Sequence, residues 1–211
     1  MIISFEGLDG VGKSSISRKF AENYNFKYIE RPLYEVFGIK DKESVEYNVA
    51  CKVEDKVYNG TKSPELKASL TSLGLIYLHK EMKDENIVID RDLLSNFSYN
   101  GTKESLPIFE ALLKMNIYPD ITFLLYANKI TRMQRIAKRN PKDKDLMAPE
   151  VTMQTYEKIF KFIKKYDLNV FVINTEEKTE KEVFEEVKTK YEEVIARNGN
   201  TKSSREYELD R

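Results

Sequence analysis

The residues with the clearest capacity for chemistry lie near the start of the chain, at positions 7–14. They read G-L-D-G-V-G-K-S and fit the pattern G-x-x-x-x-G-K-[ST] of a Walker A loop. In such a loop the glycines let backbone N–H groups surround the phosphates of a nucleoside triphosphate, while Lys13 reaches the β and γ phosphates and Ser14 ligates magnesium. The sequence therefore predicts ATP and Mg²⁺ as cofactors. The predicted nucleotide-binding residues are Gly7, Asp9, Gly10, Val11, Gly12, Lys13, Ser14 and Ser15.

A second informative pair, Asp90 and Arg91, ends the third apolar segment of the chain. ATPases that hydrolyse their substrate usually place two acidic residues there, one of which activates water. An arginine instead suits the binding of phosphate, so the pair favours phosphoryl transfer over hydrolysis. A GTPase is disfavoured because residues 128–131 read N-K-I-T and lack the aspartate of the guanine-reading motif N-K-x-D.

These residues need a scaffold, and five short apolar segments rich in β-branched and aromatic residues predict one. The segments alternate with stretches of helical periodicity, which is the pattern of a parallel sheet covered by helices on both faces. We therefore predict an α/β fold of the P-loop NTPase type, in three layers, with a five-stranded parallel sheet flanked by helices and a small mobile lid. The predicted strands are 2–6, 26–30, 87–90, 121–126 and 170–174. Among the predicted amphipathic helices, the one before the third strand carries Leu66, Leu70, Leu73 and Tyr77.

The chain is expected to form a single kinase domain over residues 1–197. The lid is predicted at about residues 136–150, where Pro141, Pro149 and many charges lie between two helical patterns. The polar stretch 198–211 lacks periodicity, so it is predicted to be a flexible tail.

The overall composition narrows the range of partners. Lys plus Arg and Asp plus Glu number 35 each, so no global field draws the protein onto nucleic acid or an anionic membrane. No apolar run approaches the roughly 20 residues of a membrane span, and no charged-then-apolar leader precedes the first strand. Cys51 is the single cysteine, so no internal disulfide is possible. The sequence predicts a cytoplasmic protein that binds small-molecule nucleotides, with no nucleic acid and no membrane as partner.

Four segments of the sequence resemble the thymidylate kinases, a family of nucleoside monophosphate kinases. Residues 5–14 resemble the family's F-E-G-L-D-G-x-G-K-S, and residues 90–101 resemble D-R-Y/H-x-x-S-x-x-A-Y-Q-G in spacing throughout. P-D-I-T at 119–122 and R-I-A-K-R at 135–139 resemble the P-D-L-T strand and the arginine-bearing lid, and N-T at 174–175 completes the match. The resemblance implies the family fold, usually a homodimer, and transfer of phosphate from ATP to a nucleoside monophosphate, with dTMP the leading acceptor.

The resemblance also implies roles for individual residues. Asp9 would lie near the acceptor sugar, while Asp90 and Arg91 would stand at the junction of magnesium, donor phosphate and acceptor phosphate. Asn96 and Asn100 would contact the acceptor base, which suits an amide because it donates and accepts at once. The predicted substrate-binding residues are Asp9, Arg31, Tyr77, Ser95, Asn96, Tyr99 and Asn100.

The predicted lid has to supply a further cation. Some thymidylate kinases carry an arginine in the Walker A loop, where this chain has Val11. Arg135 and Arg139 are four residues apart and share one helix face, so both are candidates. The predicted catalytic residues are Lys13, Asp90, Arg91, Arg135 and Arg139, and the predicted metal ligands are Ser14 and Asp90.

Departures from the family leave the acceptor open. The family's T-R-E-P-G-G after the second strand is replaced by E-R-P-L at 30–33, and residues 69–82 contain no arginine where the family reads the thymine carbonyl with one. His79, the only histidine, is expected at the surface of that helix. Two alternatives to a monophosphate kinase remain. One is a deoxynucleoside kinase with Glu6 as general base for a 5′-hydroxyl, and the other is a nucleotide-binding sensor that has lost turnover.

Overall fold

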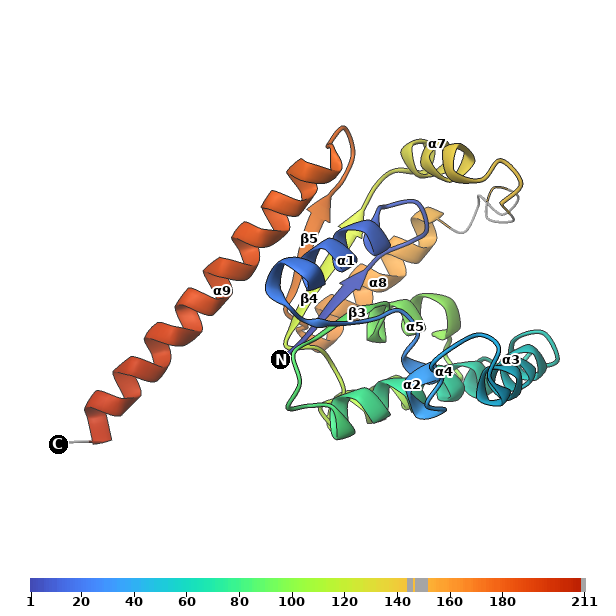
Figure 1. The fold of residues 1–211 in the computed structure, drawn as a ribbon, viewed down its shortest axis with the longest axis horizontal. Coiled ribbons are helices and arrows are strands. Elements are labelled where there is room, and N and C mark those ends of the chain that lie inside the picture. The colour runs from blue at the N-terminus through green and yellow to red at the C-terminus, as the bar shows by residue number, and fades with distance from the viewer. Residues whose placement is uncertain (144–145, 147–151, 210–211) are drawn as a thin grey trace.

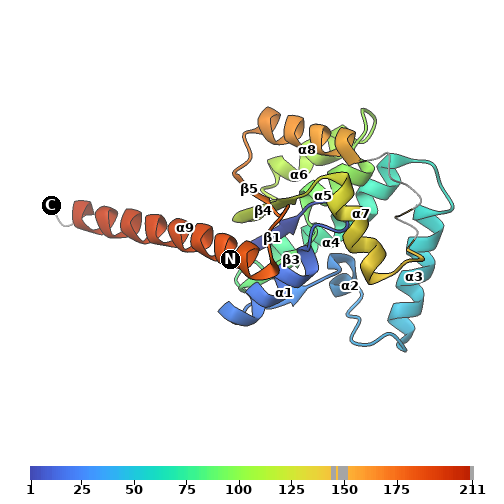
Figure 2. The same ribbon diagram turned by 90° about the horizontal axis from the view of Figure 1, so that it is seen from above.

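The computed structural model describes residues 1–143, 146 and 152–209. The described chain forms a five-stranded sheet with helices on both sides (Figures 1 and 2). The strands are β1 (Ile2–Glu6), β2 (Lys27–Ile29), β3 (Ile87–Asp90), β4 (Ile121–Tyr126) and β5 (Val170–Asn174). The helices are α1 (Lys13–Tyr24), α2 (Pro32–Val36), α3 (Val45–Tyr58), α4 (Pro64–Glu81), α5 (Leu93–Asn100), α6 (Leu106–Lys114), α7 (Lys129–Arg139), α8 (Thr152–Tyr166) and α9 (Glu180–Leu209). The predicted α/β fold and its five strands are confirmed, with β2 shorter than expected.

The order of the strands brings distant chemistry together. The sheet runs β2-β3-β1-β4-β5 and every pairing is parallel, with β1 between β3 and β4. Phe5 of β1 is level with Asp90 on one side and Phe123 on the other. Because parallel strands have their carboxyl ends at one edge, the segments that follow β1 and β3 leave the sheet side by side. Ser14 and Asp90 are thereby in contact although 76 residues separate them in the chain.

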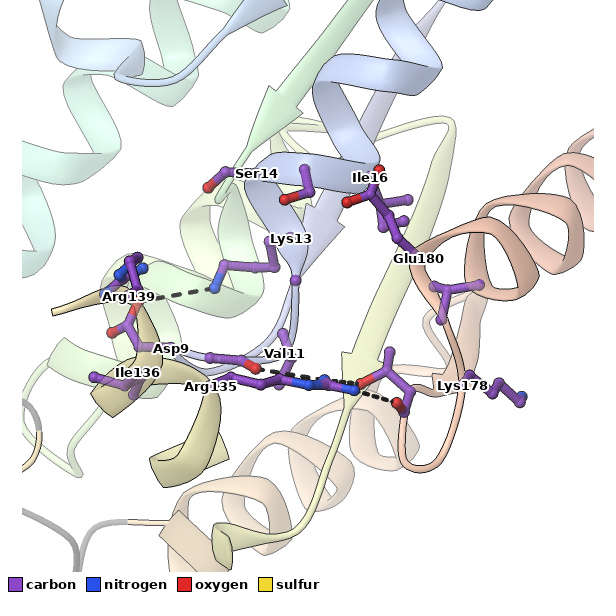
Figure 3. A pocket seen from close by; sticks show the side chains of 15 residues that line it. Asp9, Val11, Lys13, Ser14, Ile16, Arg135, Ile136, Arg139, Lys178 and Glu180 are labelled. Atoms are coloured by element: carbon purple, nitrogen blue, oxygen red, sulfur yellow. Dashed lines mark hydrogen bonds and ion pairs between the residues drawn. The ribbon is translucent and has the colours of Figure 1, made fainter. Parts of the chain in front are cut away.

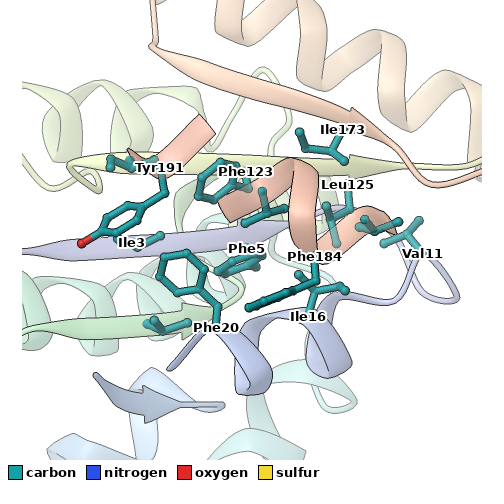
Figure 4. Close-up of a cluster of buried hydrophobic side chains, with 14 of the residues drawn as sticks. Ile3, Phe5, Val11, Ile16, Phe20, Phe123, Leu125, Ile173, Phe184 and Tyr191 are labelled. Carbon is teal, nitrogen blue, oxygen red and sulfur yellow. The ribbon is translucent and has the colours of Figure 1, made fainter. Parts of the chain in front are cut away.

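Two clusters of buried side chains define the layers. On one face of the sheet α1 and α9 pack over an aromatic cluster in which the rings of Phe20 and Phe123 lie 6.3 Å apart (Figure 4). On the other face α4, α5, α6 and α8 enclose a second cluster, where Phe97 and Phe162 stack with ring centroids 3.9 Å apart. Successive strand residues serve opposite faces, so Leu124 belongs to the second cluster while Phe123 belongs to the first.

Helix α4 directs part of its apolar stripe outward. Leu66 is 54% exposed and Leu73 is 45% exposed, and Figure 1 shows α4 along the edge of the molecule far from α7 and α9. The buried side of the helix holds the small residues Ala68, Ser72 and Gly74 together with the larger Leu75, Leu78 and His79, and α4 packs against α2 and α5. The predicted helix is confirmed, while two of the leucines that predict it point to the outside.

The carboxyl-terminal part of the chain differs from the prediction. Helix α9 continues to Leu209, and both ribbon views show its second half extending away from the rest of the molecule. The segment 198–211, expected to be irregular because it lacks periodicity, is thus helical as far as Leu209, while the flexibility predicted for it stays a prediction. Of the predicted lid, residues 136–143 and Leu146 are described, and the rest lies outside the described residues.

No described helix is both long and apolar enough to cross a membrane.

Candidate active site

The Walker A loop joins β1 to α1 in a shape that requires glycine. Its φ angles are +127° at Gly7, +86° at Gly10 and +95° at Gly12. A Cβ atom on Gly7 would lie 2.2 Å from the carbonyl oxygen of Leu125 in β4, and one on Gly10 would lie 2.7 Å from that of Arg132 in α7. The loop is thus enclosed between β4 and α7. Helix α1 begins inside the loop, so the positive end of its dipole faces the place where phosphates would bind.

Lys13 is buried beneath this loop. Its Nζ donates to the carbonyl oxygen of Leu8 at 3.0 Å and lies 4.0 Å from Oδ1 of Asp9. Burial, together with the charge of Arg91, lowers the pKa of Lys13 to about 8. Anionic phosphates in the loop would reverse this effect and offer the ammonium group better acceptors than a carbonyl. The position is compatible with the predicted contact between Lys13 and the β and γ phosphates.

The predicted metal ligands, Ser14 and Asp90, are in direct contact. The hydroxyl of Ser14 donates to Oδ2 of Asp90, and Tyr28 donates to the same oxygen at 3.3 Å. Oδ1 of Asp90 is buried and has no hydrogen-bond partner among the described residues. A hydroxyl and a spare carboxylate oxygen fit Mg²⁺, which takes one or two protein oxygens and completes its shell with phosphates and water. No group of three or more acidic, histidine or cysteine side chains forms a separate metal site in the described part.

Asp9, Arg91 and Tyr99 form a triad beside the loop. The guanidinium of Arg91 forms an ion pair with Asp9 and donates to the hydroxyl of Tyr99 at 3.3 Å, while Tyr99 donates to Oδ2 of Asp9 at 3.1 Å. Burial alone would raise the pKa of Asp9, but the charges of Arg91 and Lys13 outweigh it and hold that pKa below the usual range. Asp9 therefore stays ionised, and the structure brings together three of the predicted site residues.

A cavity of about 330 Å³ opens between the Walker A loop, α7 and the start of α9 (Figure 3). Both predicted lid arginines line it, with different partners. Arg135 donates to the hydroxyl and the carbonyl oxygen of Thr175 at 2.9 and 2.6 Å, so its guanidinium forms part of the wall. Arg139 is largely exposed and pairs with Asp143 at 2.8 Å. The remaining lining residues include Ser15, Lys178, Glu180 and Val183.

Three predicted substrate-binding residues on α5, two of which are the predicted base contacts Asn96 and Asn100, make contacts inside the protein. The hydroxyl of Ser95 donates to the carboxylate of Glu6. The amide of Asn96 donates to the carbonyl oxygen of Ala68 in α4 at 3.2 Å, and the amide of Asn100 donates to Oδ1 of Asn96 at 3.0 Å. All three predicted residues are buried. Their described partners attach α5 to α4 and β1, so reading a base would require these amides to exchange partners.

Two further predicted substrate contacts lie apart from the triad. Arg31 precedes α2, donates to the hydroxyl of Tyr34 at 2.6 Å and lies 3.8 Å from Glu54. It lines a second cavity of about 240 Å³ between α2 and α3. Tyr77 packs on the small apolar cluster around Leu78, at the ends of β2 and β3. Tyr77 therefore packs against the core in this structure, and a contact with substrate stays a prediction.

Arg132 is a candidate that the sequence analysis missed. It is only 5% exposed, and its Nε donates to the carbonyl oxygen of Asp9 at 2.7 Å. Its Nη1 is buried and lacks a hydrogen-bond partner among the described residues. The neighbouring Arg135 also reaches the loop, at 3.5 Å from the carbonyl oxygen of Gly10. The spacing of three residues between Arg132 and Arg135 was the available signal, since it places both on one face of a helix.

Glu6 and His79 occupy the interior, and the predicted surface position of His79 is wrong. The Glu6 carboxylate accepts from the backbone N–H groups of Asp92, Leu94 and Ser95, each at 3.0 Å. Burial and the charge of Asp92 nevertheless raise the pKa of Glu6 to about 7. His79 Nε2 lies 3.1 Å from Oδ2 of Asp92. This contact compensates for the burial of the polar imidazole ring. The partner, Asp92, lies on another segment, so the helical spacing of α4 alone does not reveal the contact.

Asn128 has a structural task where a GTPase would read guanine. Its Oδ1 accepts from the backbone of Thr131 at 2.9 Å and caps α7, and its amide donates to Glu176 at 2.8 Å. These contacts agree with the argument from sequence against a GTPase.

Known proteins support a common ancestry over most of the chain. The family model for thymidylate kinase matches residues 71–187, just over half of the chain. A probable thymidylate kinase of Archaeoglobus fulgidus is 27% identical over 203 residues, which cover 92% of this chain and 96% of that protein. A probable thymidylate kinase of Methanocaldococcus jannaschii is 25% identical over 193 residues, which cover 89% and 93%.

Solved structures share the fold at lower identity. A deoxyadenosine kinase from M. mycoides with bound dATP has a TM-score of 0.60 and 21% identity, and the match covers 91% of this chain and all of that chain. A thymidylate kinase from Ehrlichia chaffeensis has a TM-score of 0.56 and 17% identity, covering 91% and 98%. Both likenesses concern the arrangement of strands and helices.

Proposed function

Because the chain belongs to the thymidylate kinase family and is an ATP-dependent nucleotide kinase, we propose that it phosphorylates a nucleoside monophosphate, with dTMP as leading acceptor and Mg²⁺ as metal. The observation that carries the proposal is the placement of charge around Asp9. Lys13 and Arg91 both approach Oδ1 of this carboxylate, next to the Ser14–Asp90 pair. Moving a phosphoryl group between two anions requires cations placed around the transferred group.

Each residue has a role in this proposal. Lys13 holds the donor phosphates, and Ser14 and Asp90 hold the metal. Mg²⁺, when bound, neutralises the charge that develops on the phosphate oxygens. Arg91 exchanges Asp9 for the acceptor phosphate and keeps it in line with the donor. The acceptor is already an anion, so no general base is required.

The environment of Glu6 favours a monophosphate over a nucleoside acceptor. A nucleoside kinase needs a base within hydrogen-bond reach of the 5′-hydroxyl. Glu6 is 1% exposed, and its oxygens accept from the backbone and side chain at the start of α5. A carboxyl group used in this way supports α5, because it accepts from backbone N–H groups at the amino end of the helix that have no partner within the helix.

The decisive experiment measures ADP release from ATP and Mg²⁺ with a panel of nucleoside monophosphates and deoxynucleosides. We expect turnover with dTMP above the others, and loss of turnover in Lys13→Ala. Lys19→Ala removes a lysine from the same helix outside the cavity and serves as the matched control. Turnover with deoxynucleosides only would replace the proposal by a nucleoside kinase. Tight ATP binding without any turnover would replace it by a sensor.

We also propose that the protein is a homodimer. The exposed leucines of α4, Leu66 and Leu73, support this state, because they lie one above the other at a spacing of seven residues on an outer helix. Two copies of such a helix can bury each other's stripe about a two-fold axis.

A further inference from the structure

Arg91 holds an unusual backbone conformation at the centre of the proposed reaction. Its φ angle is +85°, in the left-handed region that residues with a side chain rarely adopt because it is strained. Such a conformation persists only where the surrounding contacts hold it. One of these contacts is made by Arg91 itself, whose backbone N–H donates to the carbonyl oxygen of Phe5 in β1 at 3.1 Å. The following residue, Asp92, supplies the others.

Asp92 is fixed on three sides. Its N–H donates to Oε1 of Glu6 at 3.0 Å, and its Oδ1 accepts from the N–H of Leu93 at 2.6 Å, which caps α5. Its Oδ2 lies 3.1 Å from Nε2 of His79. The carboxylate of Asp92 is completely buried, so an Oδ2 without its partner would be a buried unsatisfied acceptor.

His79 is the only one of these partners that comes from α4. Its side chain is almost completely buried, and it faces the acidic groups Asp92 and Asp120 and the neighbouring Lys80. A histidine that merely filled the core would be satisfied by any nearby carbonyl group. Here the ring reaches across to the residue that directly follows Arg91, so α4 and the phosphate-binding arginine are linked through a single side chain.

We propose that His79 is a positioning residue for phosphoryl transfer, which acts through Asp92 to hold the backbone of Arg91 and thus aim its guanidinium at Asp9 and Tyr99. This inference rests on the proposed role of Arg91. His79 would assist Arg91 through Asp92, although it does not line the cavity at the Walker A loop. Helix α4 thereby gains a mechanical connection to the reaction centre.

The test compares two substitutions of His79 with a control on the same helix. His79→Phe keeps the ring but removes the donor, whereas the amide of His79→Gln can place an N–H near the position of Nε2. We expect His79→Phe to lower kcat by about tenfold or more with the KM for ATP nearly unchanged, and His79→Gln to recover most of that loss. Leu78→Ala leaves a cavity beside His79 and lowers the melting temperature, but we expect it to keep kcat.

A second measurement does not depend on turnover. Crystal structures of the wild type and of His79→Phe should show Arg91 left-handed and paired with Asp9 in the first, and released from that arrangement in the second. Unchanged geometry of Arg91 in His79→Phe would overturn the inference, as would a loss of kcat in Leu78→Ala equal to that in His79→Phe. A wild type inactive on every acceptor would refute the proposed function, while the crystal structures would still decide the role of His79.

Discussion

Arg91 is ordered before any phosphate arrives. Its ion pair with Asp9 and its hydrogen bond to Tyr99 hold the guanidinium in one place. The side-chain entropy of an arginine is therefore lost when the protein folds and not when substrate binds, which favours binding. Asp9, whose pKa stays below its usual range, is the anion that an incoming phosphate has to replace. A dianionic phosphate competes well for a guanidinium because it offers bidentate, charge-assisted hydrogen bonds.

The Ser14–Asp90 pair makes a prediction about metal dependence. Asp90→Asn removes the negative charge from a proposed metal ligand, so we expect the Mg²⁺ concentration for half-maximal turnover to rise at least about tenfold. Titration of turnover with Mg²⁺ at saturating ATP measures this shift. Tyr28→Phe removes a hydrogen bond to the same carboxylate but keeps its charge, and should shift the midpoint far less. Equal shifts in both variants would contradict the metal role of Asp90.

Glu6 makes a prediction about pH and stability. Its folded-state pKa of about 7 is above the ordinary value of 4.5, so its stabilising contribution is complete below about pH 4.5 and is lost as the pH rises through about 7. Relative to Glu6→Gln, the wild type should lose up to roughly 3 kcal/mol of unfolding free energy between pH 5 and pH 8. Urea unfolding at several pH values measures the difference. Parallel pH profiles for the two proteins would contradict a raised pKa.

At the scale of the elements, α7 and α8 hold the Walker A loop from outside. The carbonyl oxygen of Asp9 is bound by Arg132, and the N–H of Leu8 is bound by the hydroxyl of Tyr156 at 3.3 Å. Tyr156 in turn donates to the carbonyl oxygen of Leu125 in β4 at 3.2 Å. The shape of the loop is thus maintained by α7 and α8, two helices outside the Walker A loop itself.

This connection predicts the effect of removing Arg132. Arg132→Met keeps the apolar stem but leaves the carbonyl oxygen of Asp9 without its donor, so we expect ATP binding to weaken by about tenfold or more. Calorimetric titration with ATP and Mg²⁺ measures the affinity. Lys138→Met removes an exposed charge from the same helix and is the matched control. Equal weakening in both variants would reduce the role of Arg132 to general electrostatic attraction.

The elements also show what the sequence can and cannot predict. The Walker A loop and the strands follow from local patterns, because glycine spacing and buried apolar runs are readable over ten residues or fewer. The roles of Glu6, His79 and Arg132 depend on partners 13 to 123 residues away, which local patterns do not contain. The leucines of α4 predict a helix correctly but not which face it buries, because its buried face includes small and polar residues such as Ala68, Ser72 and His79 whose partners lie on other elements.

At the scale of the whole molecule, the exposed stripe of α4 makes a prediction about assembly. Leu73→Glu places a charge in the proposed two-fold interface, so we expect the dimer to dissociate, with a loss of at least about 2 kcal/mol of association free energy. Sedimentation velocity over a range of concentrations measures the state. Ile130 is also strongly exposed but lies on α7, so Ile130→Glu should leave the dimer intact. A monomeric wild type would refute the proposed homodimer directly.

The central position of β1 in the sheet has a consequence for folding while the protein is synthesised on the ribosome. Its neighbours β3 and β4 start at Ile87 and Ile121, so the first strand to be made waits for partners encoded far downstream. At about 5–20 residues per second, the 114 residues between the end of β1 and the start of β4 take about 6–23 seconds to appear. Until β3 has been made both edges of β1 lack a partner, and the edge that pairs with β4 lacks one to the end of the interval. The phosphate site, although its motif is translated first, can be completed only after more than half of the chain has emerged.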